Sequence, residues 1–487
     1  MLDSSFSTLD WLIFGSYFLA LAISSYLLSR TSISSTRDYF VSQNSMPLLA
    51  VAISVVATSQ SAATFLGAPE YSYKGDLTFI GFYISALLAV IFVSFVLVPR
   101  FYAHKCITVY ELLGHRYGLE AKKQASVMFL VGRIIASGAR LYIGSIAISM
   151  ILFSDITIVH IALSTALLLL GALSYTYFGG IKSIIYSDVL QASIYIGSAF
   201  IVLWYLYTSL DGVEIFALLD AKSKLKLFDT ASSNQFNIIA LLSGWLLLNI
   251  AAFGLDQDMT QRVLTCKNGH EATLSLIISI IITIFVVLLF LAIGSLLYLH
   301  YEKAVVDQSF AGESVTIFMY YILTELPDGL KAVVTVGVVA TTLSSTNSVL
   351  GALSSVAIED LYRPWQESRS TKSEDHFVRA SKVAVLLATL ALFLMALLSY
   401  VWQNYTSHSL LSFALGVMAY SYTGLLGIYF SAIFTKRGNS RTTLLALVVG
   451  FLSVLLLGDF GLQLPFAHQI SIGTLLAFAS VQLGSQK

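Results

Sequence analysis

Charged residues are scarce in this sequence. Asp, Glu, Lys and Arg make up 11% of its 487 residues, whereas a soluble globular chain carries about 25%. Hydrophobic residues make up 57%, and the mean hydropathy is +0.82. Because a bilayer excludes charged side chains, this depletion predicts a membrane protein.

The sequence also lacks the residues of most cofactor and active sites. Its 2 cysteines, Cys106 and Cys266, are too few and too far apart for a disulfide framework or a zinc site. Its 8 histidines have no HExxH spacing. The 27 basic and 27 acidic residues cancel, so nothing points to nucleic acid as a partner. The apolar segments contain no paired aspartates, no Ser–His arrangement and no metal cluster, so we expect no enzyme.

Apolar segments long enough to cross a membrane fill the chain instead. A spanning helix needs about 20 mostly apolar residues, and about thirteen segments meet this length. They lie at residues 8–29, 48–68, 77–98, 122–152, 156–178, 185–208, 236–256, 271–300, 329–356, 380–402, 409–434, 442–458 and 468–484. Basic residues concentrate on every second connection: roughly nineteen, Arg262 among them, lie on one side of the membrane and about five on the other. The positive-inside rule then places the N-terminus outside and the C-terminus in the cytoplasm of a multi-pass inner-membrane protein.

Polar side chains interrupt the second segment, in "SVVATSQSAATF" from Ser54 to Phe65. The polar residues at its centre are Thr58, Ser59, Gln60, Ser61 and Thr64. Such a run predicts a broken helix that lines a cavity, whose freed carbonyls can bind a small cation. The alternative is hydrogen bonding between neighbouring helices.

A second polar stripe lies in "ATTLSSTNSVLGALSS", which begins at Ala340. On a helix, one face carries Thr341, Ser344, Ser345 and Ser348, with Asn347 on the neighbouring edge. Small residues could simply allow close helix packing. Because glycine and alanine would also serve that purpose, a stripe made of hydroxyls favours cation binding.

Two ionisable residues lie inside apolar segments. Asp188 either caps a helix at the membrane interface or faces the bundle and binds a cation. Arg133 lies too deep in segment 122–152 to reach water easily, and Arg140 follows two turns later. The Arg133 fork fits either a substrate carboxylate or a structural acid, and Asp256 or Asp258 could be that acid.

Six stretches together resemble the sodium:solute symporter family, with the closest likeness to its bacterial sialic acid branch. They are "STRDYFV", "SVVATSQSAATFLGAPEYSYKGD", "ITVYELLGHRYG", "YFGGIKSIIYSDVLQ", "DQDMTQRVLTCKN" and "VVATTLSSTNSVLGALSSVAIEDLY". They occur in family order over about residues 35–435.

The resemblance implies an all-α polytopic fold with the five-plus-five inverted repeat of the leucine transporter. Residues 1–487 would form one membrane transport domain. Within it, 8–29 would be an extra N-terminal helix, 48–208 and 236–434 the two repeats, and 442–484 two C-terminal helices. The first helix of each repeat, at 48–68 and 236–256, would be broken at mid-membrane.

The resemblance also implies sites. A first sodium site would use Ala57, Gln60, Thr341, Ser344 and Ser345. A second would use Asp188, Ser344, Asn347 and Ser348, where Asn347 replaces a hydroxyl of the sialic acid branch. Substrate would contact Ser59, Ser61, Thr64, Phe79, Tyr83 and Arg133, where Tyr83 replaces a glutamine. Asp256 and Asp258 stand where the sugar carriers have Asn and Tyr.

The implied function is a sodium-coupled secondary active symporter. It would import a small, carboxylate-bearing solute by alternating access. The alternatives are a sodium-coupled sugar or amino-acid symporter, a proton-coupled carrier that uses Asp188, and a non-transporting nutrient sensor on the same fold. We expect Na⁺, a small solute and the lipid bilayer as partners, and a monomer.

Overall fold

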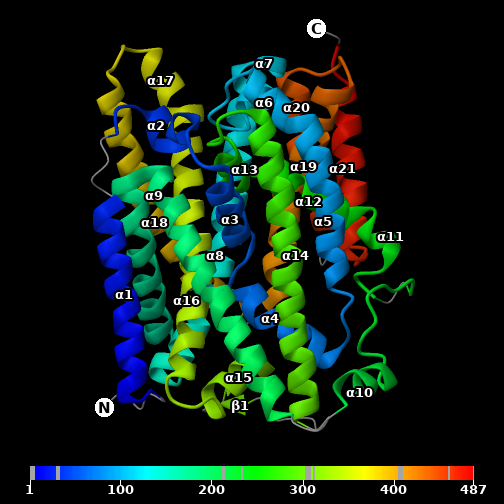
Figure 1. Ribbon diagram of the computed structural model, residues 1–487. Helices are drawn as coiled ribbons and strands as arrows, with labels where there is room; N and C mark the ends of the chain where they lie inside the picture. The colour runs from blue at the N-terminus through cyan, green and yellow to red at the C-terminus, as the bar shows by residue number, and fades with distance from the viewer. Residues whose placement is uncertain are drawn as a thin grey trace.

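The computed structural model describes residues 6–28, 33–210, 214–231, 234–301, 309–310, 313–403, 410–458 and 461–485. Long helices run side by side, and the two chain termini lie at opposite ends of the bundle (Figure 1). We call these the N end and the C end. Among the described residues, the strands are limited to the two-residue pair β1 (Ser309–Phe310) and β2 (Glu313–Ser314).

The longest helices fall on the expected apolar segments. They are α1 (Thr8–Leu28), α5 (Ile80–Phe92), α8 (Leu119–Phe153), α9 (Ile158–Ser209), α14 (Gly269–His300), α16 (Leu330–Val356), α18 (Glu374–Gln403), α19 (Leu410–Phe434), α20 (Ser440–Leu457) and α21 (Phe466–Gln482). By length and apolarity, 8 described helices can cross a membrane, or up to 10 if each bent helix pair is one span.

Two expected segments, 156–178 and 185–208, lie in the 52 residues of α9, which consists of two helices joined at a kink. The helix changes direction at Gly180, whose φ is 57°. A Cβ atom there would lie 2.6 Å from the Tyr39 carbonyl oxygen, so glycine provides both the backbone conformation and the close approach. The two expected segments are therefore two helices, and the connection expected at 179–184 is a kink at Gly180.

Two further spans are broken. Helix α3 (Leu48–Ser59) meets α4 (Ala62–Lys74) at a bend of 65°. The second span consists of α11 (Ile238–Leu241), α12 (Gly244–Gly254) and α13 (Gln257–Val263), with a bend of 55° before α13. Helix α4 lies nearer the N end than α3 does (Figure 1). The first break lies where the polar residues predict it. The second was expected from the family resemblance inside segment 236–256, but it lies at the end of that segment, and the span continues to Val263.

Short helices cover the ends of the bundle. At the C end lie α2 (Thr36–Val41), α6 (Val98–Ala103), α7 (Glu111–Tyr117) and α17 (Arg363–Glu367), and at the N end lie α10 (Ile215–Ala221) and α15 (Ile317–Thr324) (Figure 1). The irregular turns are the 3₁₀ segment η1 (Ser42–Asn44) and the π-helical segments η2 (Val93–Leu97) and η3 (Ala357–Tyr362).

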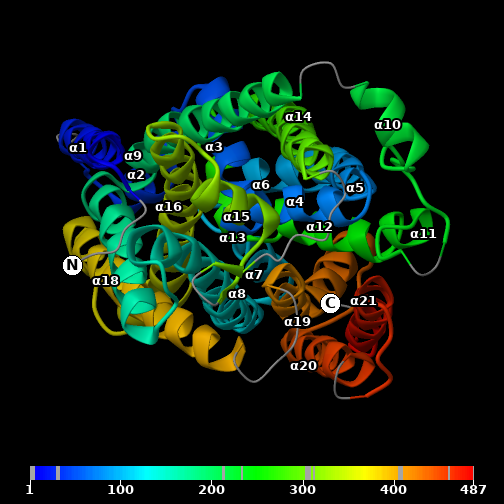
Figure 2. The same ribbon diagram turned by 90° about the horizontal axis from the view of Figure 1, so that it is seen from below.

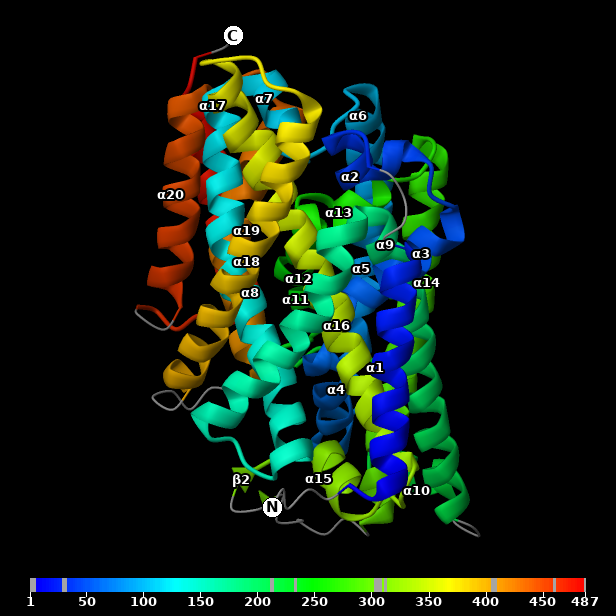
Figure 3. The ribbon, with the colours of Figure 1, turned by 90° about the vertical axis from the view of Figure 1, so that its left-hand side faces the viewer.

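Helix α16 lies inside the bundle, whereas α1, α18 and α20 lie at its rim (Figure 2). In the most apolar stretch of each span, 89% of residues are buried for α16 but only 28% for α1 and for α18. Helix α1 runs beside α9 and α16 (Figure 3). Its Asp10 Oδ1 accepts the Gly329 N–H at 2.8 Å and so satisfies a free donor at the start of α16. Because most of α16 is buried among other helices, its hydroxyl stripe faces protein.

A buried charge cluster ties α7 to α8 at the C end. The Lys122 ammonium lies 2.9 Å from the buried Asp360 carboxylate and 3.9 Å from that of Glu111. Thr108 and Ser126 also donate to Asp360, at 2.6 and 2.8 Å. Burial raises the pKa of Glu111 from 4.5 to about 7 despite Lys122.

Glu111→Gln should stabilise the protein at pH 8 and have little effect at pH 5. The pKa of Glu111 is higher in the folded protein than in the unfolded chain. The folding stability present below pH 4.5 is therefore lost progressively as the pH rises from 4.5 through about 7. The shift corresponds to about 3 kcal/mol, and glutamine can still accept the Ile107 N–H. Thermal unfolding of purified protein at both pH values measures this, with exposed Glu120→Gln as the control. Equal stabilisation at pH 5 and pH 8 would contradict the assignment.

Candidate functional site

The first break exposes backbone carbonyls in the middle of the bundle. The Gln60 N–H bonds to the Val56 carbonyl at 3.2 Å and is the last donor into α3. Gln60 and Ser61 are extended, and α4 begins at Ala62. The Ala57 carbonyl therefore follows the last hydrogen bond of α3 and is available to a ligand.

The hydroxyl stripe of α16 lies against this break. The Thr58 and Ser348 hydroxyl oxygens are 3.0 Å apart, and both residues are buried. Thr341 and Ser344 on the same helix are 0% exposed. The structure thus brings together the two polar stretches that are about 290 positions apart in the chain.

Unpartnered buried oxygens mark the expected first sodium site. Thr341 Oγ1 and Gln60 Oε1 are buried and have no hydrogen-bond partner among the described residues. A buried oxygen without a partner costs about 1–3 kcal/mol, and neutral oxygens of this kind are ligands for a hard cation. Ser344 donates to Asp188 at 2.7 Å and Ser345 to the Thr342 carbonyl at 3.0 Å, which leaves their lone pairs available. Hydroxyl and amide oxygens of this kind suit a sodium ion, whereas Ser345 also lines a small cavity beside Arg133 and Arg140.

The expected second site already contains a protein cation. Asp188 is 0% exposed, which rules out an interfacial helix cap. Its Oδ1 accepts from Ser344, and its Oδ2 accepts from Ser54 at 2.5 Å and from Arg262 Nε and Nη2, both at 3.3 Å. Arg262 Nη2 also donates to Ser348. Asn347, the remaining expected ligand, donates weakly to Ser187 at 3.4 Å, and its Oδ1 is buried without a hydrogen-bond partner among the described residues.

Arg262 was not expected in this site. The sequence predicts a loop residue of the cytoplasmic side, but Arg262 lies in α13 and is 0% exposed. Its position could have been predicted from its spacing of four residues from Asp258, which places both side chains on one helix face. The two contact each other, with 3.6 Å between Arg262 Nη1 and Asp258 Oδ1.

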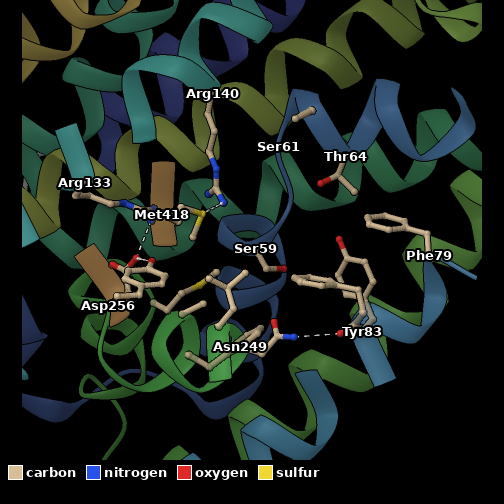
Figure 4. Close-up of a pocket in the computed structure, with 17 residues that line it drawn as sticks. Ser59, Ser61, Thr64, Phe79, Tyr83, Arg133, Arg140, Asn249, Asp256 and Met418 are labelled. Atoms are coloured by element: carbon tan, nitrogen blue, oxygen red, sulfur yellow. Dashed lines mark hydrogen bonds and ion pairs between the residues drawn. The ribbon is translucent and has the colours of Figure 1, made fainter. Parts of the chain in front are cut away.

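A cavity of about 80 Å³ lies beside the first break (Figure 4). All six residues expected to contact substrate line it: Ser59, Ser61, Thr64, Phe79, Tyr83 and Arg133. Other lining residues include Phe82, Arg140, Asn249, Phe253, Asp256, Met259, Met418 and Tyr422. The cavity therefore combines hydroxyls and guanidinium groups with aromatic and thioether walls.

Arg133 is bound by acids of the second break. Its Nη1 lies 2.7 Å from Asp256 Oδ2, and its Nη2 pairs with Asp258 Oδ2. Tyr422 also donates to Asp256, whose Oδ1 accepts the Asp258 N–H at 2.9 Å as the cap of α13. Of the two possibilities left open by the sequence, the structure shows the structural acid.

Arg140 is the arginine of this cavity that lacks an ion pair among the described residues. Its Nη2 donates to Met418 Sδ at 3.1 Å, a weak acceptor (Figure 4). No role was expected for Arg140 from the sequence. Its place in the cavity could have been predicted from its spacing of seven residues from Arg133, which puts both side chains on one face of α8.

Arg133→Met should destabilise the protein by about 3–5 kcal/mol, because it leaves the buried Asp256 without its counter-ion and Asp258 with Arg262 alone. Arg140→Met is the matched control and should change stability by less than about 1 kcal/mol, because no acid depends on Arg140. Thermal unfolding of the two purified variants measures the difference. Equal stability of the two variants would show that Arg133 does not hold the second break.

A model of the sodium:solute symporter family matches residues 39–450. The sodium/sialic acid symporter SiaT of Proteus mirabilis is 27% identical over 452 residues, covering 90% of this chain and 87% of that protein. Sodium-coupled monocarboxylate transporter 1 of Mus musculus is 25% identical over 469 residues, covering 94% of this chain and 74% of that protein.

A solved structure has the same fold. It is a Na⁺-coupled sialic acid symporter in a substrate-bound outward-open state, with a TM-score of 0.85 at 24% identity. The match covers 99% of this chain and 100% of that chain. The expected all-helical fold of the leucine-transporter type is confirmed.

Proposed function

We propose, from the premise that the chain belongs to the sodium:solute symporter family, that its solute is a small organic carboxylate bound by Arg140. As a member of that family, the chain is a multi-pass membrane protein that couples solute transport to sodium, and it is not an enzyme.

Arg140 is the observation that carries the proposed solute class. A guanidinium in a largely apolar cavity is costly unless an anion pairs with it. A carboxylate offers two parallel hydrogen bonds in the geometry of the Arg fork. Ser59, Ser61 and Thr64 line the same cavity and supply hydroxyls for further polar groups of the solute.

The size and walls of the cavity favour a compact acid. An engineered cavity of about 150 Å³ accommodates benzene, and the cavity beside Arg140 measures about 80 Å³. Tyr83 and Phe79 form aromatic walls, with their ring centroids 5.6 Å apart. We therefore favour a solute of a few carbons over a bulky sugar acid such as the one named for the bacterial relative.

Sodium would bind where α3 ends against α16. The proposed ligands are the Ala57 carbonyl with Gln60, Thr341, Ser344 and Ser345. Ser59 and Ser61 flank the same break and line the cavity. An ion that fixes the break therefore also orders the solute site, which couples the two binding events before the site opens to the other side.

We propose that the N end faces outward and the C end faces the cytoplasm of a bacterial-type inner membrane. The support is the concentration of basic residues at the C end, among them Arg100, Lys105, Arg116 and Arg363. We further propose a monomeric protein with the repeat boundaries given by the sequence.

Uptake into proteoliposomes tests the function. Labelled lactate, sialic acid, proline and glucose are offered in NaCl or in choline chloride. We expect sodium-dependent uptake of lactate or another short carboxylate. Uptake of sialic acid alone would replace the compact solute by a larger acid, and uptake of proline alone would replace it by a zwitterionic one. Uptake of glucose without any of the three acids would overturn the solute class. Binding without uptake would support a sensor.

A further inference from the structure

Arg262 occupies the place expected for a second sodium ion. Its guanidinium contacts two of the four expected ligands, the Asp188 carboxylate and the Ser348 hydroxyl. A sodium ion at Asp188 Oδ2 would lie beside this guanidinium, and like charges repel strongly in a buried site.

Contacts from several helices hold Arg262 in this position. Arg262 Nε donates to Ser54 of α3 at 2.9 Å, and Nη1 donates to the Asp258 carbonyl of its own helix at 2.6 Å. Nη2 reaches Ser348 of α16 and Asp188 of α9. All three nitrogens of the group are thus satisfied, and Arg262 is 0% exposed.

The charges of this region also balance without a second ion. Three guanidinium groups, from Arg133, Arg140 and Arg262, face three carboxylates, from Asp188, Asp256 and Asp258. A carboxylate solute at Arg140 and one sodium ion at the first site add no net charge. A second sodium ion would leave one uncompensated positive charge in the bundle, which is costly.

We propose that Arg262 is the built-in cation of the second site, so that each carboxylate solute moves with one sodium ion and without net charge. This rests on the proposed function, since it assumes an anionic solute and the first sodium site. It replaces the second sodium ion expected from the family resemblance.

Equilibrium binding of ²²Na⁺ to the purified full-length protein tests the ion count without a solute. We expect one ion per chain for the wild type and two for Arg262→Met. Adding Asp188→Asn to Arg262→Met should return the count to one, which places the extra ion at Asp188. Two ions in the wild type would overturn the proposal, and so would a folded Arg262→Met variant that binds one.

Membrane voltage gives a second test on the wild type. A potassium diffusion potential is imposed on proteoliposomes in sodium medium, and accumulation of a monocarboxylate is measured. If one net charge moved with each solute, 100 mV would change this accumulation about fifty-fold. We expect no change. Absence of any bound sodium would contradict sodium coupling itself. Two bound ions or voltage-driven accumulation of the monocarboxylate would overturn only the role of Arg262.

Discussion

Arg140→Gln should lower the initial rate of sodium-dependent carboxylate uptake by about a hundredfold at low solute concentration. Loss of one member of a buried charge pair costs about 2–5 kcal/mol, and a hundredfold corresponds to about 3 kcal/mol. Arg133 cannot substitute, because both of its terminal nitrogens pair with Asp256 and Asp258. The effect should appear mainly as weaker solute binding, because the variant leaves no buried acid without a counter-ion.

Arg140→Lys is the matched control for this result. Lysine keeps the positive charge but lacks the planar fork, so partial recovery is expected. The sodium count from ²²Na⁺ binding should stay at the wild-type value in both variants, which separates solute binding from ion binding. Wild-type uptake by Arg140→Gln would show that the solute carboxylate, if there is one, binds elsewhere.

Thr341→Val should raise the sodium concentration for half-maximal uptake by at least about tenfold. The substitution keeps the shape of the side chain but removes the unpartnered Oγ1, which we propose as a direct ligand of the ion. Stability should stay the same or increase slightly, because an unsatisfied buried hydroxyl becomes an apolar group. Sodium titration of solute uptake measures the change.

Thr342→Val is the control for Thr341→Val. It makes the same chemical change at the next position, but Thr342 Oγ1 donates to the Val338 carbonyl at 2.8 Å within its own helix. Its sodium dependence should remain close to that of the wild type. If the two variants shifted the sodium dependence equally, Thr341 would not be a specific ligand.

The sequence predicted the helical segments and the first break well, because both depend on local composition. An apolar run of membrane length specifies a helix, and five polar residues around Gln60 specify where it opens. The kink at Gly180 was harder to foresee. A Gly-Gly pair between two apolar runs is typical of a loop, and the nearby Tyr39 backbone that favours a kink is remote in sequence.

The pairing of charges could not be predicted from the sequence. Arg133 is more than 120 positions from Asp256 and Asp258 in the chain, so its choice of partner depends on how α8 packs against the second break. Arg262 was placed in a loop because it follows the end of an apolar segment. The bend before α13 instead turns this residue back into the bundle, where Asp188 binds it.

Hydrogen exchange tests most directly whether one sodium ion links the α3–α4 break to α16. Amide exchange is followed in the purified protein in NaCl and in an equal concentration of KCl. We expect sodium to slow exchange in peptides that cover residues 56–65 and 340–348 together, and Thr341→Val to remove both effects at the same sodium concentration. Unchanged exchange in both segments, or protection of only one of them, would contradict a shared ion.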